Sequence, residues 1–310
     1  MAYNCLHTDS DIEARVFNDD VATLTSRVFR TPFDFGKLVL SVNFHTLPDA
    51  CVLVEVQVCA DNRWSPFFKL GLFAHKIYTG FPEQTNDFGE VKTDELVLFC
   101  PAQAYRYRIR LYGEAEVLLF GVSTTPFTAQ YDENKAARLP ADEKNITVFP
   151  CSQLLQNTPD KHRICSPTSV YMALRALGFS VTLDAVLTRV FDPTAGIYGN
   201  WLFNVAAAGS FGAQAFIRFF DSLEELAEFV SPHSLVVASI AFEKGELTGA
   251  PTERTAGHLV VVRGWKDGRV LVADPASETE QEVLRSYDAR EFARAWLERK
   301  KGVAYIVRIK

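Results

Sequence analysis

The chain has 310 residues, of which 48% are hydrophobic, and its formal net charge at pH 7 is −6. This length predicts two domains, and the apolar content is sufficient for ordinary buried cores. The acidic balance, and the lack of any basic run interleaved with aromatic residues, argue against a nucleic-acid-binding protein. The longest apolar runs, such as residues 235–242, fall far short of the roughly 20 residues that a membrane-spanning helix needs, so no membrane partner is expected.

The start of the sequence lacks the marks of a secretory signal. Residues 1–9 contain neither a basic segment nor an apolar one, so we expect a cytoplasmic protein. The six cysteines are scattered, with no C-x-x-C pair and no histidine at metal-ligand spacing. The sequence therefore supports neither a zinc site nor a dense disulfide framework, and we expect no metal and no other cofactor.

Residues 1–130 are rich in short apolar or alternating runs, which are typical of strands. In residues 105–111 the arginines share one parity, and the tyrosines share the other with Ile109 and Leu111. This alternation predicts a half-buried strand that is basic outside and apolar inside. Several such runs at intervals of roughly ten residues predict an all-β sandwich domain. The predicted strands cover residues 37–43, 51–59, 95–99, 104–112 and 116–122.

A polar stretch separates this domain from the rest of the chain. Residues 131–147 contain almost no large apolar side chain, and we interpret them as a linker. The second domain then covers residues 148–310.

The segment that follows Arg163 predicts an amphipathic helix whose start suits cysteine chemistry. Ser166 can serve as N-cap and Pro167 as the first helical residue, and Gly178 ends the apolar stripe. Cys165 is then expected just outside the helix, where unpaired N–H groups and the macrodipole favour the nucleophilic thiolate. The alternative is a small packing residue at a helix cap. Cys151 is a rival nucleophile, but no comparable helix start follows it.

A nucleophilic cysteine needs a base, and His258 is the one histidine that begins a strong strand, over residues 259–265. His162 is a competing base because it is close to Cys165 in sequence. It lies in a charged stretch, residues 160–163, that we expect to be solvated.

The strand after His258 returns through a turn at residues 266–269, and the register of this hairpin decides where Asp274 lies. A two-residue loop would pair residue 266 with 269 and place Asp274 on the face opposite to His258. A three-residue loop with a left-handed Gly268 and a bulge is also a common hairpin type, and it places Asp274 diagonal to His258, about 7–8 Å away. The carboxylate could then orient the imidazole while the other ring nitrogen addresses the thiol. The alternative is a polar histidine at a strand start and an Asp-Pro pair that only ends a strand.

Five segments resemble one family, the papain-like peptidases of the C39-like branch, which are related to the bacteriocin double-glycine leader peptidases. They are residues 149–153, 164–172, 198–201, 257–258 and 274–275, and the resemblance covers about residues 145–310. It implies a nucleophile, a base, an orienting acid and an oxyanion-hole side chain, which are Cys165, His258, Asp274 and Gln153.

The same resemblance makes Asn200, Trp201 and Gly257 candidates for substrate binding. The sequence departs from the family pattern at Ile164, where the residue before the nucleophilic cysteine is usually glycine. This departure puts the breadth of accepted substrates in doubt.

After Cys165 the predicted helices come first and the strands later, which indicates an α+β fold, papain-like by the resemblance, with a helical lobe that carries the cysteine packed against an antiparallel sheet that carries the histidine and the aspartate. Helices are predicted at 183–191 and 201–208 and from Ser222 and Asp288 onward, and strands at 235–241, 259–264, 269–273 and 303–309.

The expected function is a cysteine peptidase or amidase that acts on a peptide or peptide-like substrate. An acyltransferase with the same acyl-enzyme and a catalytically silent binding protein are the alternatives. Residues 62–65 and 84–89 also resemble front domains attached to some of these peptidases, where an exposed Trp64 would suit stacking with a glycan or a peptide. The alternative is that Trp64 is an ordinary core residue.

Overall fold

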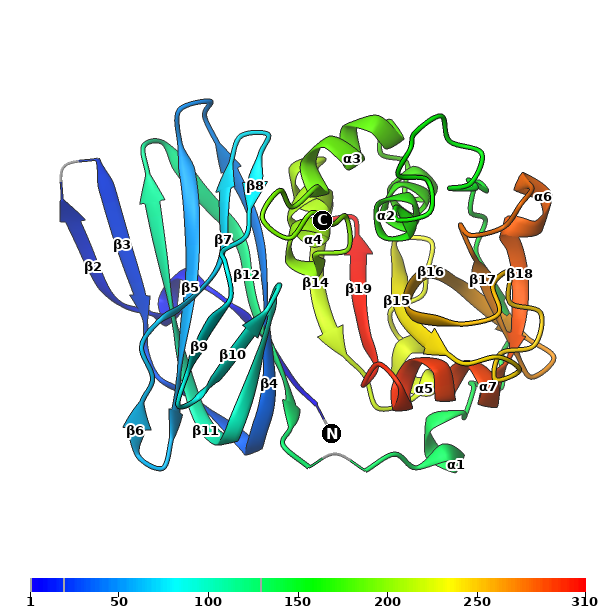
Figure 1. Cartoon of the computed structure of the whole chain (residues 1–310), viewed down its shortest axis with the longest axis horizontal. Coiled ribbons are helices and arrows are strands. Elements are labelled where there is room, and N and C mark those ends of the chain that lie inside the picture. Colours follow the sequence, from blue (N-terminus) through cyan, green and yellow to red (C-terminus); the bar gives the residue numbers. More distant parts are fainter. Residues whose placement is uncertain (1, 19, 129) are drawn as a thin grey trace. The chain divides into compact units, whose positions relative to one another are not determined.

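The computed structural model describes residues 2–18, 20–128 and 130–310 (Figure 1). The chain divides into two compact units. The first unit contains Met1–Ala129 and Thr188–Ser210, and the second contains Gln130–Leu187 and Phe211–Lys310. The domain bounds 1–130 and 148–310 therefore stay a prediction, and residues 188–210 pack with the N-terminal part of the chain.

The described strands of the first unit form one sheet, which confirms a sheet-rich N-terminal part, while the sandwich arrangement stays a prediction. Hydrogen bonds join its described strands into a continuous sheet in the order β1-β12-β4-β11-β5-β7-β8, with the other strands on branches. The strands are β1 (Tyr3–His7), β2 (Ile12–Asn18), β3 (Val21–Ser26), β4 (Phe29–Thr46), β5 (Cys51–Ala60), β6 (Arg63–Trp64), β7 (Phe68–Ala74), β8 (Tyr78–Thr79), β9 (Gln84–Asn86), β10 (Gly89–Lys92), β11 (Glu95–Tyr112) and β12 (Ala115–Pro126). Two predicted strands, 95–99 and 104–112, are parts of the single strand β11.

The alternation within β11 decides which of its side chains are buried. Tyr105, Tyr107 and Ile109 are buried, as their parity predicts. The arginines on the other face are only half-exposed because polar side chains of β5 lie opposite them: Arg108 is paired with Glu55 and Arg106 with Gln57. The basic face is therefore partly covered, which the pattern of one strand does not reveal.

Helix α4 (Trp201–Ser210) contacts the sheet of the first unit, and the predicted helix at 201–208 is confirmed. The carboxylate of Asp94 accepts hydrogen bonds from the first two backbone N–H groups of α4, those of Trp201 and Leu202. The amide of Asn43 on β4 donates to the Val205 carbonyl at 3.2 Å. Within this unit, the Phe203 ring also packs edge-on against Phe73, with 5.4 Å between the centroids.

The second unit is an antiparallel sheet with a few helices. The strand order is β14-β19-β15-β16-β17-β18, and β13 pairs with β16. The strands are β13 (Lys144–Asn145), β14 (Gln214–Phe219), β15 (Ser234–Phe242), β16 (Thr255–Lys266), β17 (Arg269–Ala273), β18 (Leu284–Asp288) and β19 (Val303–Arg308). The strands predicted at 235–241, 259–264, 269–273 and 303–309 are confirmed, whereas β14 and β18 were not predicted.

Helix α2 (Cys165–Ala176) is the longest helix of this unit and lies against β15 and β16 (Figure 1). The Ser169 hydroxyl donates to the Leu259 carbonyl of β16 at 2.9 Å. Apart from α4, and with α3 extending into the first unit at Thr188, the other described helices are eight residues or shorter, so the second unit is sheet-rich and the expected helical lobe is small. They are α1 (Glu133–Ala136), α3 (Leu183–Val190), α5 (Leu223–Ala227), α6 (Glu280–Val283), α7 (Ala289–Ala293) and a π-helical turn (Arg294–Glu298). Across the described residues, no helix combines the length and the apolar character that crossing a membrane requires.

The predicted linker carries local structure. Asp132 caps helix α1, and its carboxylate accepts hydrogen bonds from the backbone N–H groups of Asn134 and Lys135. The backbone of residues 144–145 pairs with β16. Both elements belong to the second unit, so much of this polar segment is attached to it.

The hairpin β16–β17 has the two-residue loop of the two considered, yet beyond the turn it reaches the register that the three-residue loop would give. The turn has two residues, Asp267 and Gly268, both with positive φ, and it pairs Lys266 with Arg269. A bulge at Arg263 then shifts the register, so that Val262 faces Val272. This bulge restores the parity that a three-residue loop would have given, and it places Asp274 on the face of His258.

Gly264 makes this bulge possible. Its φ is +152°, and a Cβ atom there would lie 1.9 Å from the Lys144 carbonyl oxygen of β13. Only glycine combines this backbone angle with so close an approach of a neighbouring chain.

We predict that Gly264→Ala destabilises the protein by about 3 kcal/mol or more, because both the backbone angle and β13 must shift. Gly268→Ala is the matched control, since its φ is +72° but no atom lies within 4 Å of the added Cβ. That variant should lose only about 1 kcal/mol. Denaturant unfolding of the two variants measures both losses, and equal losses would contradict this account of the bulge.

Candidate active site

Cys165 is the first residue of helix α2, whereas the sequence predicted it just outside the helix. The N-cap is Ile164, which is fully buried, and the first bond of the helical ladder runs from the Thr168 N–H to the Ile164 carbonyl at 3.0 Å. The predicted cap is wrong because the Ser166 hydroxyl is instead hydrogen-bonded to the Tyr305 hydroxyl at 3.0 Å. Cys165, a residue of intermediate exposure, therefore lies at the positive end of the helix, and its backbone N–H lies before the first hydrogen bond of the helical ladder.

His258 and Asp274 form a buried pair in the same unit. The imidazole Nε2 of His258 lies 2.7 Å from Oδ1 of Asp274, and the residues are 7% and 1% exposed. The same Oδ1 accepts a hydrogen bond from the Ala276 N–H at 3.0 Å. The Tyr287 hydroxyl of β18 donates to the other oxygen, Oδ2, at 2.6 Å. Both carboxylate oxygens are thus bound, and Nδ1 is the ring nitrogen left for a second partner.

His258 also acts on the thiol of Cys165. Burial disfavours the thiolate, but a hydrogen bond from His258 and the charge of its ring outweigh this, and the pKa of Cys165 lies below its ordinary value. Burial likewise disfavours a charged His258, but the charge and hydrogen bond of Asp274 raise the pKa of His258 to about 10. The pKa of Asp274 is lowered despite burial, through His258, Tyr287 and the Ala276 N–H. These directions favour a thiolate beside an imidazolium.

Gln153 is buried beside the chain that follows Asp274. Its backbone N–H donates to the Pro275 carbonyl at 2.8 Å, and its side-chain Nε2 donates to the Lys161 carbonyl at 2.8 Å. An amide nitrogen has two hydrogens, so one remains for a further acceptor. Its role at an oxyanion stays a prediction.

The rival residues have different surroundings. Burial and the charge of Glu280 raise the pKa of the Cys151 thiol to about 12, so it is protonated at neutral pH. His162 is exposed, as its charged neighbourhood predicts. Neither environment suits a nucleophile or its base.

The three candidate substrate-binding residues lie in different units. Gly257 precedes His258 and is exposed, with its N–H bound to the Thr255 hydroxyl at 3.1 Å. Asn200 belongs to the first unit and is fully buried. Its side-chain oxygen accepts from the Phe203 N–H at 3.0 Å, which caps helix α4. Trp201 follows as the first residue of that helix. Substrate contact by these residues stays a prediction, and the structure gives Asn200 a capping role.

Tyr287 was not among the predicted site residues. It lies in β18, whose five residues, LRSYD, show no extended apolar pattern. Its register opposite Val270 places it next to the hairpin that carries Asp274. A lone tyrosine in a polar stretch is a weak signal, and only strand pairing reveals its role.

Comparison with known proteins identifies the family. Residues 145–304 match the model of the Peptidase_C39 like family, and residues 6–122 match that of the Peptidase C39 N-terminal domain. The chain belongs to the Peptidase_C39-like family. This confirms the resemblance seen in the sequence.

Solved structures give weaker similarities. A Bacillus anthracis protein assigned as a C39-like peptidase is 18% identical, with a TM-score of 0.41, over 55% of this chain and 98% of its own. A structure from a study of promiscuous carbohydrate-binding modules of the β-sandwich superfamily is 11% identical, with a TM-score of 0.17, over 40% of this chain and 51% of its own. No curated protein matches the chain.

The pKa directions in this C39-like chain predict the pH dependence of alkylation. Since the pKa of Cys165 is lowered, its thiolate persists below the ordinary thiol range near pH 8.5, and iodoacetamide should modify it readily at pH 7. His258→Ala should move the rise in rate toward pH 8.5 and slow alkylation at pH 7 by at least about tenfold. Peptide mapping by mass spectrometry identifies the modified cysteine. Preferential labelling of Cys151, or an unchanged profile in the variant, would contradict this assignment.

Tyr287→Phe tests the support of the buried carboxylate. Loss of this donor should raise the pKa of Asp274 and cost about 1–3 kcal/mol of stability. A lowered carboxyl pKa stabilises the fold at neutral pH and is lost on acidification, so the variant should begin to lose stability at a higher pH than wild type. Unfolding between pH 7 and 3 measures this.

Tyr171→Phe is the control for that experiment, because among the described residues the Tyr171 hydroxyl has no carboxylate partner. If the stability of wild type and of Tyr287→Phe falls identically as the pH is lowered, the Tyr287 hydroxyl does not stabilise the Asp274 carboxylate.

Proposed function

We propose that this chain is a cysteine peptidase or amidase that cleaves a peptide-like bond through a thioester on Cys165. The observation that carries the proposal is the His258–Asp274 pair at 2.7 Å, coupled to a cysteine at a helix start whose thiol pKa is lowered. Family membership supports peptide chemistry. Asp274 holds Nε2 of the imidazole, so that Nδ1 addresses the thiol.

The reaction then follows from the charges of the pair. The Cys165 thiolate attacks the carbonyl carbon, and the negative charge moves to the carbonyl oxygen. The Cys165 N–H and the second amide hydrogen of Gln153 are the donors proposed for this oxygen. As the intermediate collapses, the bond to nitrogen breaks, and the imidazolium of His258 gives its proton to the departing amine.

The thioester is next resolved by water. Neutral His258 takes a proton from the water molecule as its oxygen attacks the thioester carbon, and the carbon–sulfur bond then breaks. The products are a carboxylic acid and the Cys165 thiol, which again shares its proton with His258. An amine or thiol in place of water would make the protein an acyltransferase, so the acceptor separates the two alternatives.

Mass-spectrometric profiling of a peptide library tests the proposal. Wild type should cleave a subset of peptides, and Cys165→Ala and His258→Ala should lose at least about a thousandfold in kcat/KM. Gln153→Ala should lose about a hundredfold or more, the usual cost of one oxyanion donor. Cys151→Ala and His162→Ala are matched controls that should keep wild-type activity.

Adding a primary amine to the same reactions separates the outcomes. Exclusive formation of amide products would favour the acyltransferase. If no peptide is cleaved and no covalent adduct forms at Cys165 with an electrophilic peptide, the enzymatic proposal fails. A binding protein is then the remaining alternative.

A further inference from the structure

A row of directly opposed residues crosses four strands of the first unit. Trp64 on β6 faces Cys59 on β5, Cys59 faces Ala104 on β11, and Ala104 faces Arg30 on β4. Directly opposed residues lie on the same face of a sheet. The same four residues line a cavity of about 600 Å³. We call this cavity the trough.

The residue types give the trough a floor and two walls. Cys59 and Ala104 are small and form the floor. Trp64 and Arg30 are large and exposed, and they stand at opposite ends of the row. Three strand spacings separate them, which is about 14 Å between their backbones. Trp64 is 36% exposed, so it is not an ordinary core residue, which was the alternative to a stacking role.

The charge of the trough is positive. Arg30 forms no ion pair with any described residue, and Arg27, which also lines the trough, shares its charge with Asp11 at 3.0 Å. Arg106 lies beside it, with its guanidinium 5.1 Å from the Trp64 ring centroid and bound to the uncharged amide of Gln57 at 2.7 Å. None of the described residues that line the trough is acidic. The chain as a whole has a net charge of −6, so this face opposes the sign of the molecule.

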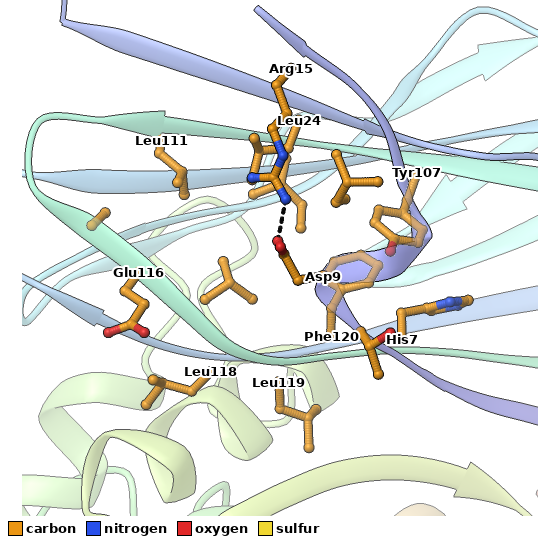
Figure 2. Close-up of a pocket in the computed structure, with 15 residues that line it drawn as sticks. His7, Asp9, Arg15, Leu24, Tyr107, Leu111, Glu116, Leu118, Leu119 and Phe120 are labelled. Carbon is orange, nitrogen blue, oxygen red and sulfur yellow. Dashed lines mark hydrogen bonds and ion pairs between the residues drawn. The ribbon is translucent and has the colours of Figure 1, made fainter. Parts of the chain in front are cut away.

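A second cavity of the same unit, of about 550 Å³, shows the contrast (Figure 2). Figure 2 shows Arg15 joined to Asp9 by an ion pair, with Glu116 also on the lining. Its one arginine is thus neutralised by a neighbour. An uncompensated arginine opposite a tryptophan distinguishes the trough.

We propose that the trough binds an acidic segment of polypeptide, with a carboxylate on Arg30 and an apolar side chain on the Trp64 ring. Guanidinium binds carboxylate through two parallel hydrogen bonds, and an exposed indole offers a flat apolar surface. An extended chain rises about 3.3 Å per residue, so 14 Å corresponds to about four residues. Side chains four residues apart point to the same side, which the two walls require. The choice of a peptide over other anions rests on the proposed peptidase function.

The test is fluorescence anisotropy with the full chain carrying Cys165→Ala, so that binding is measured without cleavage. The probe is a labelled Gly/Ser peptide with Glu and Phe four positions apart. Arg30→Ala, Trp64→Ala, and Gln in place of the peptide's Glu should each weaken binding by about tenfold. Arg15→Ala is the matched control, an arginine of the same unit outside the trough, and should bind as the parent does. A peptide with the two residues three apart should bind more weakly, because they point to opposite sides.

Reversing the charge on both the protein and the peptide shows whether a loss of binding comes from misfolding of the variant. Arg30→Glu should lose the Glu peptide and bind the peptide with Lys in its place, which an unfolded protein cannot do. Equal binding by parent and Arg30→Ala overturns the proposal. So does Arg30-dependent binding of polygalacturonate without binding of the peptide, which would assign the trough to an acidic glycan. Since all arms use the Cys165→Ala chain, loss of the peptidase proposal would leave the binding result standing.

Discussion

The carboxylate of Asp274 is the buried charge on which the second unit depends. At 1% exposure it has almost no contact with solvent, and removing a partner from a buried ion pair typically costs about 3–5 kcal/mol. Its donors come from three places: His258 on β16, Tyr287 on β18 and the Ala276 N–H just after β17. All three segments must be in register before the charge is compensated. The same contacts hold the imidazole of His258, which lowers the pKa of Cys165, so one electrostatic requirement links the folding of the sheet to the state of the thiol.

The sequence predicted much of the second unit because its signals there are local. Runs of β-branched residues gave the positions of β15, β16, β17 and β19, and the caps at Ser222 and Asp288 gave the starts of α5 and α7. The sequence left the β16–β17 turn open, however, because a three-residue loop and a two-residue loop followed by a bulge both place Asp274 on the face of His258. The one adopted depends on a bulge beside β13, which lies in a segment with the composition of a linker.

Long-range contacts account for the other differences. Ser166 has the side chain of a good N-cap, but its hydroxyl is paired with Tyr305, which is 139 positions away. The arginines of β11 alternate as residues on an exposed face would, yet Glu55 of β5 forms ion pairs with two of them, Arg108 and Arg110. In each case the local preference is correct and a distant partner outweighs it. The role of Tyr287 has the same origin, since strand pairing alone brings it to Asp274.

The division of the chain has a consequence for how the protein is made. The backbone passes between the units three times, after residues 129, 187 and 210. Helix α4, which Asp94 caps and which contributes Phe203 to the aromatic cluster with Phe73, comes from the last of the inserted residues. During synthesis the first unit therefore cannot complete its core until residue 210 has left the ribosome, when residues 130–187 of the second unit have been made but most strands of its sheet have not. The two units are therefore not consecutive segments of the chain. A fragment that ends near residue 130 would expose apolar rings that α4 covers in the whole protein.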